Sequence, residues 1–115
     1  MPQLDTLSYY VARYYARRNI LTDPSLLLLT SLADGDKHGY AMMVDIEAFA
    51  GVRLGPGTLY GAITRLEQRG WIRPVGSGDR RQPYAITGAG RDFLASEISS
   101  MDRVARTAAQ RLRPA

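Results

Sequence analysis

The sequence predicts a mainly α protein with one small β-hairpin. Three observations carry this prediction: apolar residues recur at three- and four-residue steps, proline and glycine residues separate those stretches, and two short β-prone runs flank a glycine-rich segment at 76–82. The 115 residues are 45% apolar and include no cysteine. This composition suits one domain with a modest core and leaves neither a disulfide nor a thiolate metal site.

Two helices are expected first. Residues 4–19 place Leu4, Leu7, Val11 and Tyr14 on one face, with Tyr15 as the alternative to Tyr14. A second helix over 25–33 should begin at Asp23, a good N-cap, with Pro24 in the first helical position. It is apolar nearly all round, as a central buried helix is, and Gly35 should end it.

A tight turn should separate the next two helices. The third, over about 38–50, has Met42, Ile46 and Phe49 on one stripe and ends at Gly51. The fourth begins at Pro56 and ends at Gly70. Its core-facing residues should be those at helical spacing, Leu59, Ile63 and Leu66.

The hairpin pairs the runs 71–75 and 83–87. Pro74 and Pro83 each lack a ladder donor, which favours an exposed, edge-like hairpin. Thr87 should cap a final helix that reaches about Arg111. Its apolar positions form a heptad-like seam of Leu94, Ile98, Met101, Ala105, Ala108 and Leu112.

This order of elements matches a winged helix-turn-helix with two additional helices. Residues 1–22 are expected to form an N-terminal helix that supports a dimer, 23–87 the DNA-binding domain, and 88–115 a C-terminal dimerisation helix. A helix of roughly 24 residues cannot bury an apolar seam on so small a domain, so a partner helix is expected.

Positive charge is concentrated in one segment. Residues 1–52 carry a net charge of −2, residues 53–81 carry +4 and residues 82–115 carry +2. A basic stretch in an otherwise balanced chain indicates local contact with a polyanion. The alternative is a solvated arginine face.

The fourth helix leaves polar groups outside the core. Hydroxyls, a guanidinium and free N–H groups at its N-terminus suit phosphates and base edges, and the residues concerned are Thr58, Tyr60, Gly61, Thr64 and Arg65. Gly61 costs about 1 kcal/mol in a helix interior, which close approach to DNA would explain, although simple tolerance is the alternative. We expect the ring of Tyr60 to pack on the supporting helix and its hydroxyl to meet a phosphate.

The hairpin tip carries Arg80 and Arg81. Adjacent strand residues point to opposite faces, so one of the two is expected at a phosphate or in the minor groove. Solvated loop arginines are the alternative.

Five motifs occur in order along residues 24–95. They are H-G-Y at 38–40, L-x-P-G-T-L-Y at 54–60, R-L-E-x-x-G-W-I at 65–72, R-R-x-P-Y-x-I-T at 80–87 and G-A-G-R at 88–91. Together they resemble the PadR family of transcriptional regulators. The resemblance implies a dimeric winged-helix repressor of bacterial type, from the short subgroup with a single C-terminal helix.

The resemblance also implies contact residues. These are Thr58 and Tyr60 on the recognition helix, His38 and Tyr40 near the start of the supporting helix, and Arg80 and Arg81 in the wing. Many members have an acidic residue where this chain has Ala41, and a proline or bulky residue at Gly61. Some short members bind aromatic drugs through a tryptophan on the C-terminal helix, but the only tryptophan here is Trp71, so that role does not carry over.

Two aromatic features have competing interpretations. His38 is the sole histidine, and a lone histidine near a helix start is more often a structural hydrogen-bonding residue than a phosphate contact. The tyrosines at 9, 10, 14 and 15 favour core or dimer packing over a ligand pocket.

Other function classes are disfavoured. No nucleophile elbow, paired-carboxylate pattern or phosphate-binding loop indicates an enzyme, and no metal or cofactor is expected. The longest apolar run, Leu26–Leu29, is far shorter than the roughly 20 residues of a membrane span. We therefore expect a cytoplasmic, homodimeric repressor that binds a palindromic DNA operator and is released by a small-molecule inducer. The alternative is a ligand-sensing or protein-binding winged-helix module without strong DNA affinity.

Overall fold

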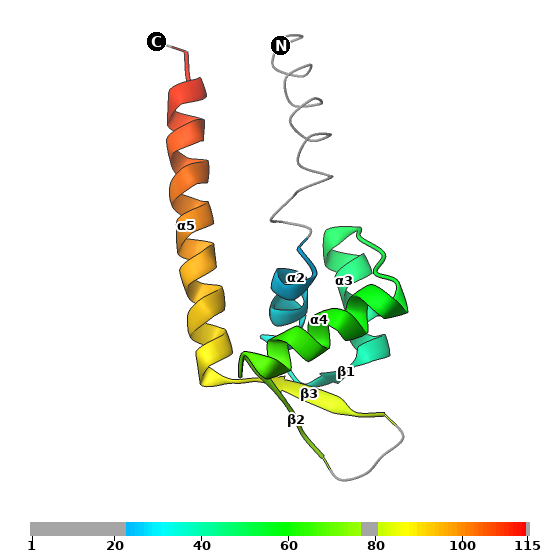
Figure 1. Ribbon diagram of the computed structural model, residues 1–115. Helices are drawn as coiled ribbons and strands as arrows, with labels where there is room; N and C mark the ends of the chain where they lie inside the picture. The colour runs from blue at the N-terminus through cyan, green and yellow to red at the C-terminus, as the bar shows by residue number, and fades with distance from the viewer. Residues whose placement is uncertain (1–22, 77–80, 115) are drawn as a thin grey trace.

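The computed structural model describes residues 23–76 and 81–114 of the chain (Figure 1). The elements within them are α2 (Pro24–Leu32), β1 (Lys37–His38), α3 (Gly39–Ala50), α4 (Pro56–Gln68), β2 (Ile72–Pro74), β3 (Pro83–Ile86) and α5 (Gly88–Leu112). The expected N-terminal helix, with Leu7, Val11 and Tyr14, lies outside the described residues, as does Arg80.

Helix α2 is the centre of the core, as its all-round apolar sequence predicted. The leucines at 26, 27, 28, 29 and 32 are at most 8% exposed. Asp23 caps the helix, since its Oδ1 accepts hydrogen bonds from the N–H groups of Ser25 (2.8 Å) and Leu26 (3.4 Å). Helices α3, α4 and α5 and strand β3 all pack on it.

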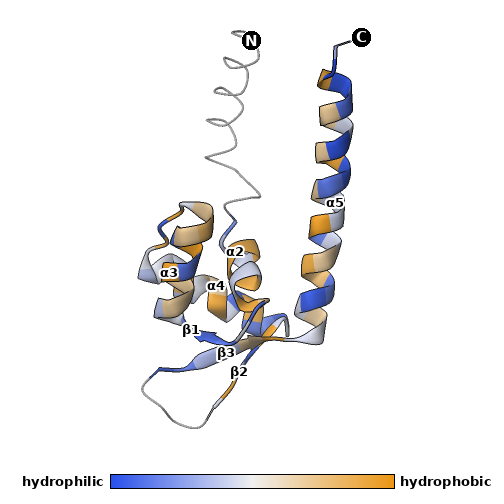
Figure 2. Cartoon of the chain, turned by 180° about the vertical axis from the view of Figure 1, so that it is seen from behind, coloured by the Kyte–Doolittle hydropathy of each residue, from blue (hydrophilic) through white to orange (hydrophobic). Residues whose placement is uncertain are grey.

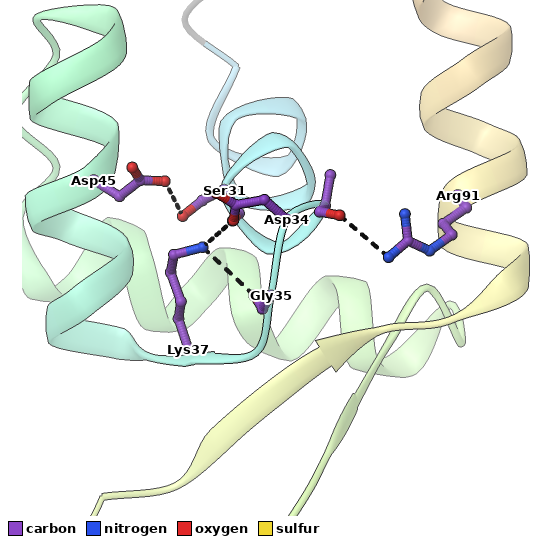
Figure 3. A network of polar contacts seen from close by, with 7 residues as sticks. Ser31, Asp34, Gly35, Lys37, Asp45 and Arg91 are labelled. Atoms are coloured by element: carbon purple, nitrogen blue, oxygen red, sulfur yellow. Dashed lines mark hydrogen bonds and ion pairs between the residues drawn. The ribbon is translucent and has the colours of Figure 1, made fainter.

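Helix α2 ends at Leu32, three residues before the expected Gly35, and two side chains hold its C-terminal carbonyls together with the Gly35 N–H (Figure 3). The cap is Ala33 in a right-handed conformation, and Gly35 has no positive φ. Lys37 Nζ donates to the carbonyl of Ser31, and Arg91 Nη2 donates to that of Ala33 (3.2 Å). Because these cations satisfy carbonyls at the helix end, no left-handed glycine is needed there.

Helix α3 follows the prediction except in its last turn. Met42 and Ile46 are fully buried, and Gly51 ends the helix with φ +68°. Phe49 was expected on the same buried stripe, but it is 46% exposed. Ala50 and Val52 pack against the core there in its place.

The sheet has three strands in the order β1-β3-β2, all antiparallel. Strand β1 was not predicted, and it makes β3 the central strand. The expectation of an edge-like hairpin is therefore wrong for β3. Pro83 is tolerated because it is the first residue of that strand, opposite His38.

Helix α4 presents its predicted face to the core, where Leu59, Ala62, Ile63 and Leu66 are at most 3% exposed. Gly70, with φ +74°, ends the helical segment and leads into β2. The β2–β3 hairpin projects beyond α4 as a wing (Figure 1). Four helices and this small sheet form a winged helix-turn-helix within the described residues.

Helix α5 begins at the predicted cap. Thr87 accepts a hydrogen bond from Gly90 N (3.1 Å) and donates one to the carbonyl of Gly70 (2.6 Å). Within the described residues, Gly90 and Leu94 are the buried residues of the helix. Farther along, polar and apolar residues alternate around α5 (Figure 2).

Candidate nucleic-acid interface

The N-terminus of α4 is open to a ligand. Gly55 is the N-cap and offers no side-chain acceptor, while Pro56 occupies the first helical position. Gly55, Pro56, Gly57 and Thr58 are all exposed. Free N–H groups at a helix N-terminus, together with the helix dipole, favour a phosphate.

The residues predicted to face DNA lie outside the core. Thr58, Tyr60, Thr64 and Arg65 are exposed and Gly61 is half-buried. The Thr64 hydroxyl donates to the carbonyl of Tyr60 (3.0 Å), which leaves its lone pairs as acceptors. Arg65 folds back along the helix, with Nη1 3.6 Å from the position of a Cβ at Gly61.

Two tyrosine side chains, one from α3 and one from α4, lie near the first turn of α3. Tyr40 is 67% exposed and Tyr60 is 55% exposed. The ring of Tyr60 packs over Gly39, the first residue of α3. The Tyr60 ring therefore packs on the supporting helix, with its hydroxyl oxygen the atom nearest the Cβ position of Gly39; the contact of that hydroxyl with a phosphate stays a prediction.

His38 caps helix α3. Its Nδ1 accepts a hydrogen bond from Ala41 N (3.4 Å), and the residue is half-buried. The structural role that a lone histidine was expected to have is therefore present. Its Nε2 stays a candidate for the phosphate contact that the sequence also predicted.

Gln82 ties the two strands of the wing together at their tip end, beyond the ladder pair of Pro74 with Tyr84. Its side-chain amide donates to the carbonyls of Val75 (2.9 Å) and Pro83 (2.8 Å). Arg81 and Arg73 are exposed, and neither forms an ion pair with a described residue. Among the described residues, the wing thus presents two exposed arginines.

Tyr84 lies on β3 near α4. Burial raises the pKa of its hydroxyl, and the carboxylate of Glu67 and the hydroxyl of Tyr60 raise it further. Tyr84 therefore stays protonated at neutral pH and is a hydrogen-bond donor.

A cleft of about 250 Å³ lies where α2, α4 and α5 meet. Trp71 and Phe93 stack in it with ring centroids 3.9 Å apart and planes inclined by 17°. The guanidinium of Arg69 lies over the Trp71 ring, 5.1 Å from its centroid. Arg65 and Glu97 also line the cleft. Sequence reasoning missed this site, because Trp71 and Phe93 belong to different elements.

The seam predicted on α5 is exposed along most of its length. Leu94 is 8% exposed, but Ile98 is 53% and Leu112 60% exposed; Met101 is half-buried and Ala105 and Ala108 are exposed. Val104, beside the seam, is 68% exposed. An apolar stripe of this kind marks an interaction surface.

Two other kinds of site are absent from the described residues. None of the helices in 23–76 and 81–114 is both long and apolar enough to cross a membrane. Over the same part of the chain, no three histidine, cysteine or acidic side chains gather in a way that could hold a metal ion.

Sequence comparison finds a family and two relatives. The model of the transcriptional regulator PadR-like family matches residues 28–96. An uncharacterized 37.1 kDa protein in transposon TN4556 of Streptomyces fradiae is 48% identical over 82 residues, 71% of this chain but 24% of that protein. The chain thus spans about a quarter of that relative. The transcriptional regulator Rv3488 of Mycobacterium tuberculosis is 33% identical over 84 residues, 70% of this chain and 78% of the regulator.

Comparison with solved structures supports the same fold. A crystal structure of a PadR family transcription regulator from Clostridium difficile R20291 matches with a TM-score of 0.69 and 24% identity. The match covers 78% of this chain and 98% of that one. At this identity the likeness shows the winged-helix fold.

Proposed function

The chain belongs to the PadR-like family of transcriptional regulators and is a DNA-binding regulator; on this premise we propose that it is a homodimeric repressor of a palindromic operator. Proteins of this kind are regulators, not enzymes. The outer face of α4 carries the proposal, because its uncapped N-terminus and exposed hydroxyls lie together. Each α4 enters a major groove by that end, and half-sites lie about one helical turn apart.

Each contact residue has a role in this proposal. Thr58, Tyr60, Gly61 and Thr64 face the bases and nearby phosphates, and Arg65 reaches the backbone at the groove edge. The remaining contacts are to phosphates beside the groove, from His38, Tyr40, Arg80 and Arg81.

The dimer forms through α5. A second copy of the helix would cover the exposed seam that includes Ile98, Met101 and Leu112. The N-terminal residues 1–22, with Leu7, Val11 and Tyr14, are proposed to add to the same interface.

A small-molecule inducer would bind the cleft between α2, α4 and α5. The site holds about 250 Å³, contains aromatic surface, and joins the recognition helix to the dimerisation helix. A ligand there contacts both elements whose relative position sets half-site spacing. The regulator acts in the cytoplasm, where bacterial DNA lies.

Binding to DNA tests the central proposal. Fluorescence anisotropy with a duplex recovered by selection from random DNA should show affinity that falls steeply with salt, by a slope of roughly −0.9 per neutralised phosphate. Thr58→Ala should weaken operator binding far more than binding to random duplex, whereas Tyr60→Phe and Arg81→Ala, which remove proposed phosphate contacts, should weaken both alike. Salt-independent, weak binding would favour the alternative, a ligand-sensing or protein-binding module without strong DNA affinity.

Sedimentation tests the dimer. Ile98→Glu places a charge on the seam at a residue that is 53% exposed in one chain, so the fold should persist while the dimer dissociates. Ser99→Glu, one residue farther along and exposed, is the matched control and should remain dimeric. A wild-type monomer at micromolar concentration contradicts this part of the proposal.

A further inference from the structure

Gly39, the first residue of α3, occupies a position where a side chain would be crowded. A Cβ there would lie 3.0 Å from Tyr60 Oη, 3.2 Å from Tyr60 Cζ and 3.3 Å from Leu59 Cδ2. All three distances are shorter than ordinary van der Waals contact. Gly39 is not among the positive-φ glycines, so space, not backbone conformation, accounts for glycine at this position.

The crowding acts on Tyr60 more than on Leu59. Leu59 is fully buried in the core, whereas Tyr60 is 55% exposed and presents the far end of its ring to Gly39. An exposed ring moves at little cost, but a buried leucine moves only with its neighbours. A methyl group at Gly39 therefore displaces the tyrosine and leaves the core in place.

Packing is what locates the Tyr60 hydroxyl. Among residues 23–76 and 81–114 that hydroxyl has no hydrogen-bond partner, while the backbone carbonyl of Tyr60 accepts from Thr64. The direction of the ring thus depends on the surface beneath it, which is Gly39 at the start of α3.

We propose that Gly39 is a positioning residue for DNA recognition. Because Gly39 has no side chain, the Tyr60 ring packs directly against its backbone, and this packing fixes where the Tyr60 hydroxyl meets the operator. This inference rests on the proposed DNA contact of Tyr60. A displacement of a few tenths of an ångström lengthens a hydrogen bond to phosphate and weakens it. Gly39 itself contacts no base or phosphate in this role.

A matched pair of variants tests whether Gly39 positions the Tyr60 ring. Gly39→Ala and Gly88→Ala both replace the first residue of a helix that follows a side-chain N-cap, His38 in one case and Thr87 in the other. A Cβ at Gly88 meets nothing within 4 Å. We expect Gly39→Ala to weaken binding to the selected operator duplex about tenfold, the size of one charge-assisted hydrogen bond, and Gly88→Ala to change it less than about twofold.

A double-mutant cycle separates positioning from a general loss of structure. With Tyr60→Ala in place, adding Gly39→Ala should weaken operator binding no further. The double variant also removes the crowded ring, so it should fold even if Gly39→Ala alone is destabilised. A loss of affinity, or of thermal stability, that persists undiminished in the double variant overturns the inference.

The remaining outcomes distinguish this inference from the function on which it rests. Suppose that Tyr60→Ala weakens operator binding but Gly39→Ala and Gly88→Ala have the same operator affinity. Then Gly39 does not position the tyrosine, while the proposed contact of Tyr60 with DNA stands. If Tyr60→Ala leaves operator affinity unchanged, the tyrosine contact is wrong and the proposed role of Gly39 is overturned with it.

Discussion

The contact between Gly90 and the start of β2 gives a sharp test of how α5 is joined to the winged domain. A Cβ at Gly90 would lie 2.1 Å from the carbonyl oxygen of Trp71, 2.9 Å from Ile86 Cγ1 and 3.0 Å from the carbonyl carbon of Trp71. The shortest of these is about 1.3 Å below the 3.4 Å at which ordinary contact begins. Gly90→Ala therefore forces backbone to move.

Three hydrogen bonds set the cost of that movement. The Trp71 carbonyl that the new methyl group meets already accepts from Thr87 N (3.0 Å), and the Thr87 side chain bonds Gly90 N and the Gly70 carbonyl. Overpacking of this kind costs about 1–3 kcal/mol, and more where backbone must yield. The better helix propensity of alanine offsets about 1 kcal/mol.

Gly88→Ala is the control, because it makes the same change two residues earlier at an open position. It should be neutral or stabilising by up to about 1 kcal/mol. Because the gain in helix propensity is common to both variants, their free energies of unfolding should differ by the overpacking cost, about 1–3 kcal/mol or more. Urea denaturation followed by circular dichroism measures this difference, at protein concentrations matched between variants because a dimer's stability depends on concentration. Equal midpoints for the two variants would refute the close contact of α5 with β2.

Three further predictions concern single side chains. Ser31→Ala should lower the free energy of unfolding by about 1–2 kcal/mol in urea denaturation, because the buried hydroxyl donates to Asp45 Oδ2 at 2.7 Å and the carboxylate would lose that donor. Arg53→Ala should leave the urea midpoint nearly unchanged in the same assay, since its ion pair with Glu47 is largely exposed. Burial raises the pKa of Tyr84 above 10.0, so its protonated form stabilises the fold at lower pH and that contribution is lost as pH rises through and beyond 10. Thermal melts between pH 8 and about 11 should show a smaller alkaline loss of stability for Tyr84→Phe than for wild type.

Local rules predicted most of the helices. Asp23, Pro56 and Thr87 each begin a helix where capping preferences place them, because the groups involved are near in sequence. The spacing of Leu59, Ile63 and Leu66 likewise identified both the buried and the outward face of α4. The candidate contact residues on α4 were identified by that same periodicity.

The incorrect predictions concern features that depend on contacts between residues far apart in the sequence. Strand β1 has two residues, too few for any alternation, and exists because Lys37 and His38 pair with Tyr84 and Pro83 some 46 residues later. Gly35 was expected to end α2, but Lys37 and Arg91 satisfy the terminal carbonyls. The residues around Lys37 and Arg91 in the sequence give no indication that either side chain bonds to α2.

The packing constraints at the site were equally hidden. The atom nearest to an added Cβ is 3.0 Å away at Gly39 and 2.1 Å away at Gly90. At three other glycines no atom lies within 4 Å: Gly55, Gly57 and Gly88. Sequence alone does not distinguish a glycine that is needed for space from one that is tolerated. The G-A-G-R and H-G-Y motifs signalled their positions but not the aromatic residues that lie against them.

The position of α5 relative to α4 depends on α2, because α5 packs on α2 and bonds its C-terminal end. At the N-terminal end Asp23 and Phe93 line one cleft, and at the C-terminal end the Ala33 carbonyl accepts from Arg91. Helix α4 packs on the same α2. In the proposed dimer, α2 would therefore help to set the distance between the two recognition helices, and a ligand in the cleft would alter it by disturbing the Trp71–Phe93 stack. The aromatic pair and the arginine of G-A-G-R would thus contribute to one geometric requirement of the proposed dimer, the spacing of the DNA half-sites.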